Sequence, residues 1–164
     1  MSASDRPTSK PPSVKFFRAA NKLVRPLLGS RFHRPLSGRL MLLTYNGHRT
    51  GREFTVPIGY FGWDPGTVLA MSSQLGWIPS LRGGSPVRLR IRGEVHEAVP
   101  TVIEDTPEVA ALLGEFVDRK GAKAAKGLML GLPGDRRPTD DELGTAAART
   151  RLVLFRLETA SQGR

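Results

Sequence analysis

Two apolar runs joined by a turn constrain the fold of this chain most. Leu40–Tyr45 and Phe54–Phe61 have the composition of strands, and the segment between them begins with Asn46-Gly47. An Asn-Gly pair is a strong hairpin signal, because both residues tolerate the positive φ that tight hairpin turns require. The sequence therefore predicts an antiparallel hairpin here, with Pro57 marking an edge or a bulge of its second strand.

The turn of this hairpin is rich in hydrogen-bond donors. Arg49 and Arg52 carry planar donor forks that suit phosphate or carboxylate, Thr50 adds a hydroxyl, and Gly51 lets the backbone approach a ligand closely. Backbone N–H groups of such a turn can also form an anion-binding nest. Two interpretations are open, an anion clamp and a solvated hairpin with surface arginines, and local features alone favour the second.

The later apolar runs predict further strands and a few helices. The strands cover Thr67–Ser72, Pro86–Arg92, Val95–Ile103 and Arg151–Glu158. The helices cover Thr106–Lys120, with Thr106 as its cap, Gly121–Leu130, and a short segment opened by the capping box Thr139-Asp140-Asp141-Glu142. About six strands, linked early by hairpins and with helices before the last strand, indicate a mainly β antiparallel barrel with flanking helices.

Positive charge is concentrated in the N-terminal third. Residues 1–52 contain 11 Lys/Arg and one acid, whereas residues 53–164 contain 14 of each, so the net charge of +10 lies in the first segment. Such a region attracts a phosphorylated cofactor, an anionic lipid surface or nucleic acid. Residues 13–28 predict a basic amphipathic helix, which can pack on the domain, cover a pocket or lie on a membrane.

The length and composition exclude several classes of protein. We expect one domain over residues 13–160 between tails at 1–12 and 161–164. The chain lacks cysteine, an apolar run of about 18 residues and a signal-peptide core, so we expect no thiolate catalyst, no spanning helix and a cytoplasmic location, with membrane association through residues 13–28 as a variant. The histidines do not cluster, and no metal site is expected.

Several short motifs follow one another in a characteristic order. Gly47-His48-Arg49-Thr50-Gly51 comes first, and after it stand Pro57, Ala70-Met71-Ser72-Ser73, Trp77, and Leu81 through Pro86-Val87. Over residues 36–104 this order resembles the deazaflavin-dependent nitroreductase family, a branch of the FMN-binding split β-barrels that often uses coenzyme F-420. The resemblance implies a split antiparallel barrel and hydride transfer from the reduced cofactor to a nitroaromatic, quinone or enone.

The resemblance also implies a cofactor site. Its phosphate contact is Arg49, with Thr50, Gly51 and Arg52 beside it. The residues expected around the ring and groove are Pro57, Ala70, Ser72, Ser73 and Trp77. The catalytic residue is unassigned, and the candidate proton donors are Tyr60, Tyr45 and Ser72.

The chain departs from the family pattern in ways that keep other functions open. Phe54 stands where a basic residue is usual, Ser73 where Lys is common and Ser80 where Asn is usual. The alternatives are an FMN- or FAD-dependent reductase, and a non-catalytic barrel that binds an anionic ligand or docks on a membrane. Both monomer and homodimer are open. Nucleic acid is the least expected partner, because aromatic residues make up only 7% of the chain and no RNP motif is present.

Overall fold

The computed structural model describes residues 40–72 and 76–159. The chain divides into two units after Gly38, and all the described residues belong to the second unit, Arg39–Arg164. The predicted tails, the helix over residues 13–28 and Ser73 lie outside the described residues, so those expectations and the predicted domain boundaries stay predictions.

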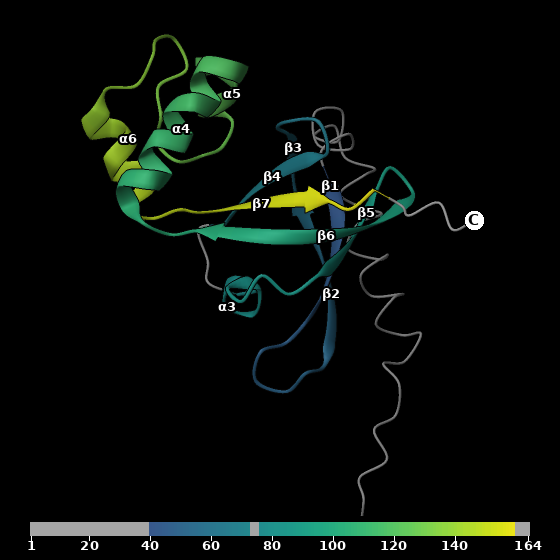
Figure 1. Ribbon diagram of the computed structural model, residues 1–164. Coiled ribbons are helices and arrows are strands. Elements are labelled where there is room, and N and C mark those ends of the chain that lie inside the picture. Colours follow the sequence, from purple (N-terminus) through teal and green to yellow (C-terminus); the bar gives the residue numbers. More distant parts are fainter. Residues whose placement is uncertain (1–39, 73–75, 160–164) are drawn as a thin grey trace, which may run out of the picture. The chain divides into compact units, whose positions relative to one another are not determined.

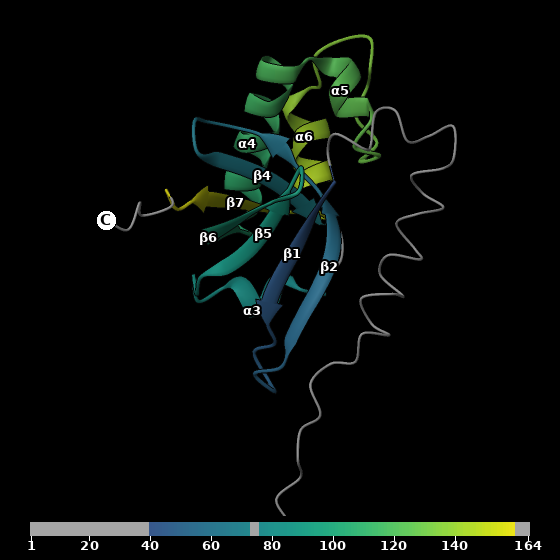
Figure 2. The same ribbon diagram turned by 90° about the vertical axis from the view of Figure 1, so that its right-hand side faces the viewer.

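In the part of the chain that the structure describes, one antiparallel sheet contains seven strands (Figures 1 and 2). They are β1 (Leu40–Asn46), β2 (Glu53–Gly59), β3 (Phe61–Gly62), β4 (Thr67–Ser72), β5 (Val87–Ile91), β6 (Glu94–Ile103) and β7 (Arg151–Leu157). Their order in the sheet is β2-β1-β5-β6-β7-β4-β3. Pro57 thus lies on an edge strand, one of its two predicted positions.

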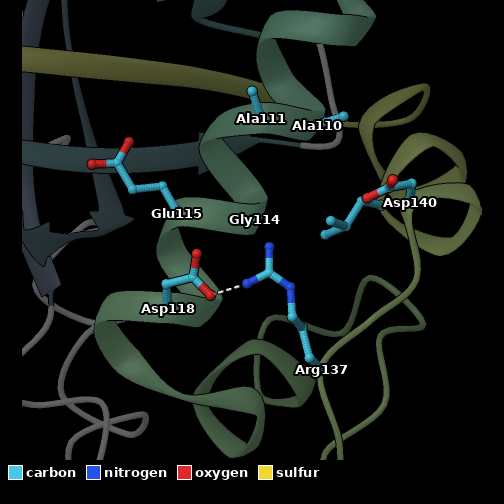
Figure 3. A pocket seen from close by; sticks show the side chains of 8 residues that line it. Ala110, Ala111, Gly114, Glu115, Asp118, Arg137 and Asp140 are labelled. Carbon is cyan, nitrogen blue, oxygen red and sulfur yellow. Dashed lines mark hydrogen bonds and ion pairs between the residues drawn. The ribbon is translucent and has the colours of Figure 1, made fainter.

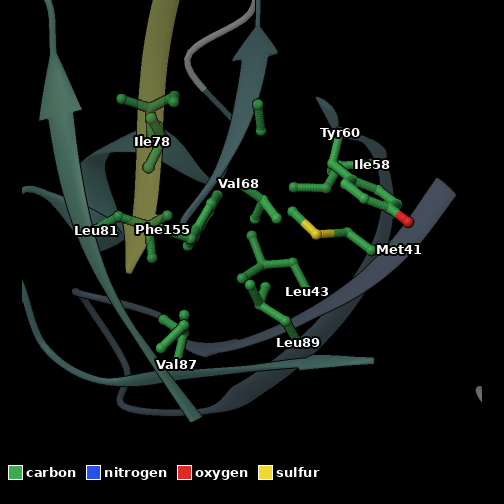
Figure 4. Close-up of a cluster of buried hydrophobic side chains, with 13 residues drawn as sticks. Met41, Leu43, Ile58, Tyr60, Val68, Ile78, Leu81, Val87, Leu89 and Phe155 are labelled. Atoms are coloured by element: carbon green, nitrogen blue, oxygen red, sulfur yellow. The ribbon is translucent and has the colours of Figure 1, made fainter. Parts of the chain in front are cut away.

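The sheet curls around one hydrophobic core. Six of its strands and the short helix α3 (Ile78–Leu81) contribute to a single buried cluster, shown in Figure 4: Met41, Leu43, Ile58, Tyr60, Val68, Ala70, Ile78, Leu81, Val87, Leu89, Ala98, Val153 and Phe155. Strand β2 also lies close to β4, so the two ends of the strand order approach each other. The predicted fold class, mainly β with flanking helices in a split antiparallel barrel, is confirmed by this arrangement.

Three helices between β6 and β7 cover the outer surface of the barrel at one end (Figure 1). They are α4 (Thr106–Lys120), α5 (Ala122–Lys126) and α6 (Asp140–Ala147). Their apolar sides form a second cluster with Leu69 of β4 and Leu152 of β7. Neighbouring strand residues alternate between the two clusters, as the two-residue period of a strand requires. Among the described residues, no helix has the length and apolar character needed to cross a membrane.

Three expectations about element boundaries were wrong. The run Phe54–Phe61 is interrupted at the buried Tyr60, because β2 pairs with β1 whereas β3 pairs with β4 at the other edge of the sheet. The helix expected over Gly121–Leu130 is shorter. The cap of α4 is Asp105 rather than Thr106, since the Asp105 carboxylate accepts a hydrogen bond from the Glu108 N–H at 3.3 Å.

Candidate functional site

The β1–β2 hairpin, which the sequence predicted, ends in a loop over residues 47–52. Asn46 pairs with Glu53, and neither Asn46 nor Gly47 has the positive φ that the Asn-Gly pair would tolerate. The left-handed conformation lies at Gly51 instead, with φ +66°. Gly47 N–H donates to the Arg52 carbonyl at 2.7 Å, and Gly51 N–H donates to the Gly47 carbonyl at 2.8 Å. These bonds close the loop on itself.

The two arginines of the loop present their charge to solvent. Arg49 and Arg52 are both exposed, and among the described residues no carboxylate pairs with either guanidinium. The Thr50 hydroxyl is used within the loop, where it accepts a hydrogen bond from the Arg52 N–H at 3.3 Å. The predicted clamp residues therefore lie together, with two positive charges available to an anion.

A pair of hydrogen bonds ties this loop to α3. Ser80 Oγ accepts the His48 backbone N–H at 3.2 Å and lies 3.2 Å from His48 Nδ1. The two residues are far apart in sequence, so the contact fixes the position of the loop relative to the barrel end. Sequence reasoning noted Ser80 only as a departure from the family pattern, and no local signal pairs it with His48.

A polar hollow of about 350 Å³ lies between this loop and the segment after α3. Its lining consists of Tyr45, Asn46, Gly47, His48, Pro79, Ser80, Gly83, Ser85, Pro86 and Val87. The Tyr45 ring stacks on Phe54 with 5.7 Å between centroids. Burial raises the pKa of the Tyr45 phenol, which therefore stays protonated near neutral pH and can act as a donor.

Phe54 has a structural role where a basic residue was expected. A Cβ atom placed on Gly47 would lie 2.8 Å from Cε2 of the Phe54 ring, so glycine is what allows this ring to pack under the loop. The Phe54 ring also stacks on the ring of Tyr45, its register partner on β1. Phe54 thus supports the loop by packing and leaves Arg52 as the second cation beside Arg49.

The predicted ring residues lie along the gap between the two ends of the strand order. Strand β3 pairs with β4 only as far as Leu69, and beyond that residue β4 continues alongside β7 to Ser72. The Ala70 side chain is buried in the barrel core, which leaves only its backbone for a ligand. Pro57 is exposed on β2, the edge strand that approaches β4.

An apolar hollow of about 310 Å³ opens beside the end of β4. It is lined by Gly59, Phe61, Met71, Ser72, Leu128, Met129, Leu130 and Thr150. The three candidate proton donors are thus separated: Ser72 lines this hollow, Tyr45 lines the polar one, and Tyr60 is 7% exposed within the core. Among the three candidate proton donors, Ser72 is the one that lies at the end of a strand and also lines a hollow with room for a small organic molecule.

Trp77 closes the barrel end beside α3. It directly precedes this helix, is partly buried, and lies against Phe155 with 6.5 Å between ring centroids. The indole therefore seals the core at this end of the barrel. Its role in a cofactor groove stays a prediction. Ser80 of α3 accepts a hydrogen bond from His48. Trp77 therefore directly precedes a helix that contacts the loop over residues 47–52, called the arginine loop below.

A charged cluster at this barrel end was not found from the sequence. Arg82 donates to both oxygens of Glu104, from Nε at 3.0 Å and from Nη2 at 2.8 Å, and Arg151 Nε lies 3.6 Å from the same carboxylate. The hydrogen bonds from Arg82 lower the pKa of Glu104, which stays ionised. Two guanidinium groups on one carboxylate leave net positive charge near Ser72, the neighbour of Arg151 on β4.

A third hollow, of about 320 Å³, lies between α4 and α6 (Figure 3). Its lining includes the small residues Ala110, Ala111 and Gly114, and Arg137 reaches into it to pair with Asp118. The carboxylate of Glu115 is paired with Arg119. Asp140, the third carboxylate of the lining, has no ion pair among the described residues, and the rest of the hollow is a groove between two packed helices with paired charges. Within residues 40–72 and 76–159, no three His, Asp or Glu side chains gather as metal ligands.

No family model and no curated protein matches the chain. Three solved structures show a partial likeness. A FAD-binding protein from Mesorhizobium loti is 18% identical over 76% of this chain and 84% of that one, with a TM-score of 0.45. A pyridoxinephosphate oxidase family protein from Clostridium acetobutylicum is 12% identical over 90% and 87%, with a TM-score of 0.47. An F-420 reductase is 11% identical over 74% and 88%, with a TM-score of 0.42. These values assign the chain to no family.

Proposed function

We propose that this chain is a deazaflavin-dependent oxidoreductase of the nitroreductase or quinone-reductase type. The observation that carries the proposal is the loop over residues 47–52. Its two arginines have no ion pair among the described residues, and hydrogen bonds tie this glycine-containing turn to the barrel end. Such a loop suits the phosphate of a large anionic cofactor such as coenzyme F-420. The sequence motifs that resemble the deazaflavin family fall on this loop, on β2, on the end of β4 and at α3.

The residues present fit a cofactor of this kind. Arg49 and Arg52 would hold the phosphate, and the backbone of Ala70, which follows the last β4 residue that β3 pairs, would face the polar edge of a planar ring. When bound, the cofactor supplies the hydride chemistry, and the protein supplies binding and orientation. Phe54 does not replace the missing basic residue, so the phosphate contact depends on the two arginines of the loop.

The protein also has to bind the acceptor and supply a proton. The apolar hollow beside Ser72 suits a small nitroaromatic, quinone or enone, because most of its lining residues are apolar. We assign the proton to the Ser72 hydroxyl, directly or through a water molecule, since Tyr60 is buried in the core and Tyr45 lies in the other hollow. A cytoplasmic location is part of the same proposal.

Binding of oxidised coenzyme F-420, FMN and FAD, followed by fluorescence, tests this function. We expect saturable binding of F-420, and Arg49→Ala and Arg52→Ala should each weaken it by about tenfold or more, as expected for a lost charge-assisted hydrogen bond. Arg156→Ala is the matched control, because Arg156 is exposed on β7 and pairs with no carboxylate among the described residues.

The other outcomes of this titration select between the alternatives. Binding of FMN or FAD alone would replace the deazaflavin enzyme with a flavin-dependent reductase. Binding of none of the three would overturn the oxidoreductase proposal and leave a barrel that binds another anionic ligand or docks on a membrane. Equal affinity in Arg49→Ala, Arg52→Ala and wild type would remove the loop from the site.

A further inference from the structure

Arg151 is the group at the barrel end that the folded chain leaves least satisfied. Its partner carboxylate, Glu104, is already engaged at both oxygens by the fork of Arg82, with hydrogen bonds of 2.8 and 3.0 Å. Arg151 Nε is buried and has no hydrogen-bond partner among the described residues. Its distance of 3.6 Å from Glu104 is too long for a hydrogen bond. A buried guanidinium N–H without an acceptor indicates a missing partner.

The position of Arg151 says where that partner would lie. Val153 and Phe155, the next alternate residues of β7, point into the barrel core, and the two-residue period puts Arg151 on the same face at the end of the strand. On β4, Val68 and Ala70 point into the same core, so Ser72 shares that face and is the register partner of Arg151. Arg151 therefore lies at the end of β7 beside the last residues of β4, which lie beyond the part of β4 that pairs with β3.

The charges around Arg151 favour an acceptor that is negative or carries carbonyl oxygens. Arg82, Arg151 and Glu104 together carry one excess positive charge, and the Arg151 side chain is 30% exposed. Its only described hydrogen bond is a long one, 3.3 Å, from Nη1 to the adjacent Thr150 carbonyl. An incoming oxygen could thus reach the exposed part of the guanidinium, and it would not have to displace Glu104 from Arg82.

We propose that Arg151 binds the carbonyl edge of the cofactor ring. This inference rests on the proposed function and adds a residue that no sequence motif pointed to. Flavin-type rings carry carbonyl oxygens on one edge, and a cation there both orients the ring and tunes its electronic properties. Arg151 and the arginine loop then have separate tasks: the loop binds the phosphate, and Arg151 binds the ring. Glu104 is a positioning residue, since its carboxylate holds Arg82 and lies beside Arg151.

The test compares Arg151→Met, Arg151→Lys and the control Arg156→Met in the full-length protein. The probe is oxidised coenzyme F-420, and both its dissociation constant and the absorption spectrum of the bound ring are measured. We expect Arg151→Met to weaken binding about tenfold or more and to shift the bound spectrum, because a cation beside the ring is lost. Arg151→Lys should restore part of both effects, and Arg156→Met should change neither.

Each result has one interpretation. If wild type binds F-420 and Arg151→Met binds it equally with the same spectrum, this inference is overturned and the proposed function stands. Weaker F-420 binding by Arg151→Met, with an unchanged absorption spectrum of the bound ring, would make Arg151 a structural residue and would also overturn this inference. If wild type binds no F-420, the proposed function fails and takes this inference with it. Should Arg151→Met not fold by circular dichroism, Arg151→Gln takes its place, because it also removes the charge, and wild-type affinity with an unshifted ring band in that variant overturns the assignment.

Discussion

Ser80 is the residue that holds the arginine loop, although it shares no sequence motif with it. Its Oγ accepts the His48 N–H and also lies within hydrogen-bond reach of His48 Nδ1. Because the oxygen accepts from the backbone, its own hydrogen is free to donate to a neutral imidazole. One hydroxyl thus satisfies two groups of His48 and fixes the base of the loop that carries Arg49.

Ser80→Ala should loosen this loop with little loss of overall stability. The His48 N–H loses its acceptor, so its amide hydrogen should exchange faster, whereas the free energy of unfolding should fall by only about 1 kcal/mol. Ser80→Thr keeps the hydroxyl and should behave like wild type. Ser85→Ala removes another hydroxyl of the same hollow and is the control. Slow exchange at His48 in Ser80→Ala would show that the loop is held by other contacts.

Residue types along the chain predicted the exposed arginines of this loop, whereas their role as an anion clamp stays a prediction. Arg49 and Arg52 are exposed, as surface arginines in a turn were expected to be. The positive φ falls on Gly51 and not on Asn46-Gly47, and Gly47 instead leaves space for the Phe54 ring. The pairings of Ser80 with His48 and of Arg151 with Glu104 depend on tertiary packing, which a single sequence does not display.

The turn between β5 and β6 stores strain that a single substitution can release. Ile91 pairs with Glu94, so the turn has two residues, and both have positive φ: Arg92 at +49° and Gly93 at +85°. Two-residue hairpins prefer this geometry, but an arginine is disfavoured in it. Arg92→Gly should therefore raise the free energy of unfolding, by up to about 1 kcal/mol.

Chemical denaturation of Arg92→Gly checks this prediction, with Arg90→Gly as its control. Arg90 lies inside β5 with an extended backbone, where glycine weakens a strand, so the control should lower stability. A loss of stability in both variants would mean that the Arg92 side chain makes a favourable contact that outweighs the backbone strain.

Helix α6 begins with a charge-dependent cap. Thr139 Oγ1 accepts the Glu142 N–H, the Glu142 carboxylate accepts the Thr139 N–H at 2.8 Å, and Arg136 donates to both oxygens of that carboxylate. The contact with Arg136, followed by the backbone contact with Thr139, lowers the pKa of Glu142 from 4.5 to about 2. The sequence predicted this capping box, whereas the partner Arg136 lies in a loop and was not predicted.

The contribution of this cap should be visible in how the melting temperature depends on pH. Because the folded pKa is lowered, the carboxylate stabilises the protein fully above its ordinary pKa of 4.5, and that contribution disappears as the pH falls toward about 2. The melting temperatures of wild type and Glu142→Gln should thus differ near pH 6 and converge near pH 2. Glu158→Gln, which removes a carboxylate with no ion pair among the described residues, is the control. A difference independent of pH would assign the effect to side-chain shape.

At the scale of the elements, alternation of side chains predicted most strands well. Val87 and Leu89 face the core and Arg88 and Arg90 face outward, so β5 has the two-residue alternation of a strand. The break at Tyr60 was missed because tyrosine, like the neighbouring Phe61, is a residue type common in strands, and only the pairing of β2 and β3 with different strands shows the break. Strand order is set by tertiary packing, which local periodicity does not encode.

The unit Arg39–Arg164 contains both hydrophobic clusters, so it should fold without the preceding residues. The barrel core and the cluster under α4–α6 are built from residues within that unit. A variant that lacks residues 1–38 is expected to keep cooperative unfolding and the wild-type β-rich circular dichroism spectrum. Loss of cooperative unfolding in this variant would show that the N-terminal segment is structurally required.

The same deletion separates cofactor binding from membrane docking. Residues 1–38 contain eight Lys/Arg and one acid, whereas Arg49, Arg52 and Arg151 all remain in the truncated chain. If the protein is the proposed oxidoreductase, the variant should keep most of its affinity for F-420, because its binding groups are intact. Association with vesicles rich in anionic lipid depends on basic residues near the surface and weakens with salt, so any such binding should be lost on deletion. A variant that loses F-420 binding but stays folded would place part of the cofactor site in the first 38 residues, whereas retained, salt-sensitive vesicle binding would assign membrane docking to the barrel.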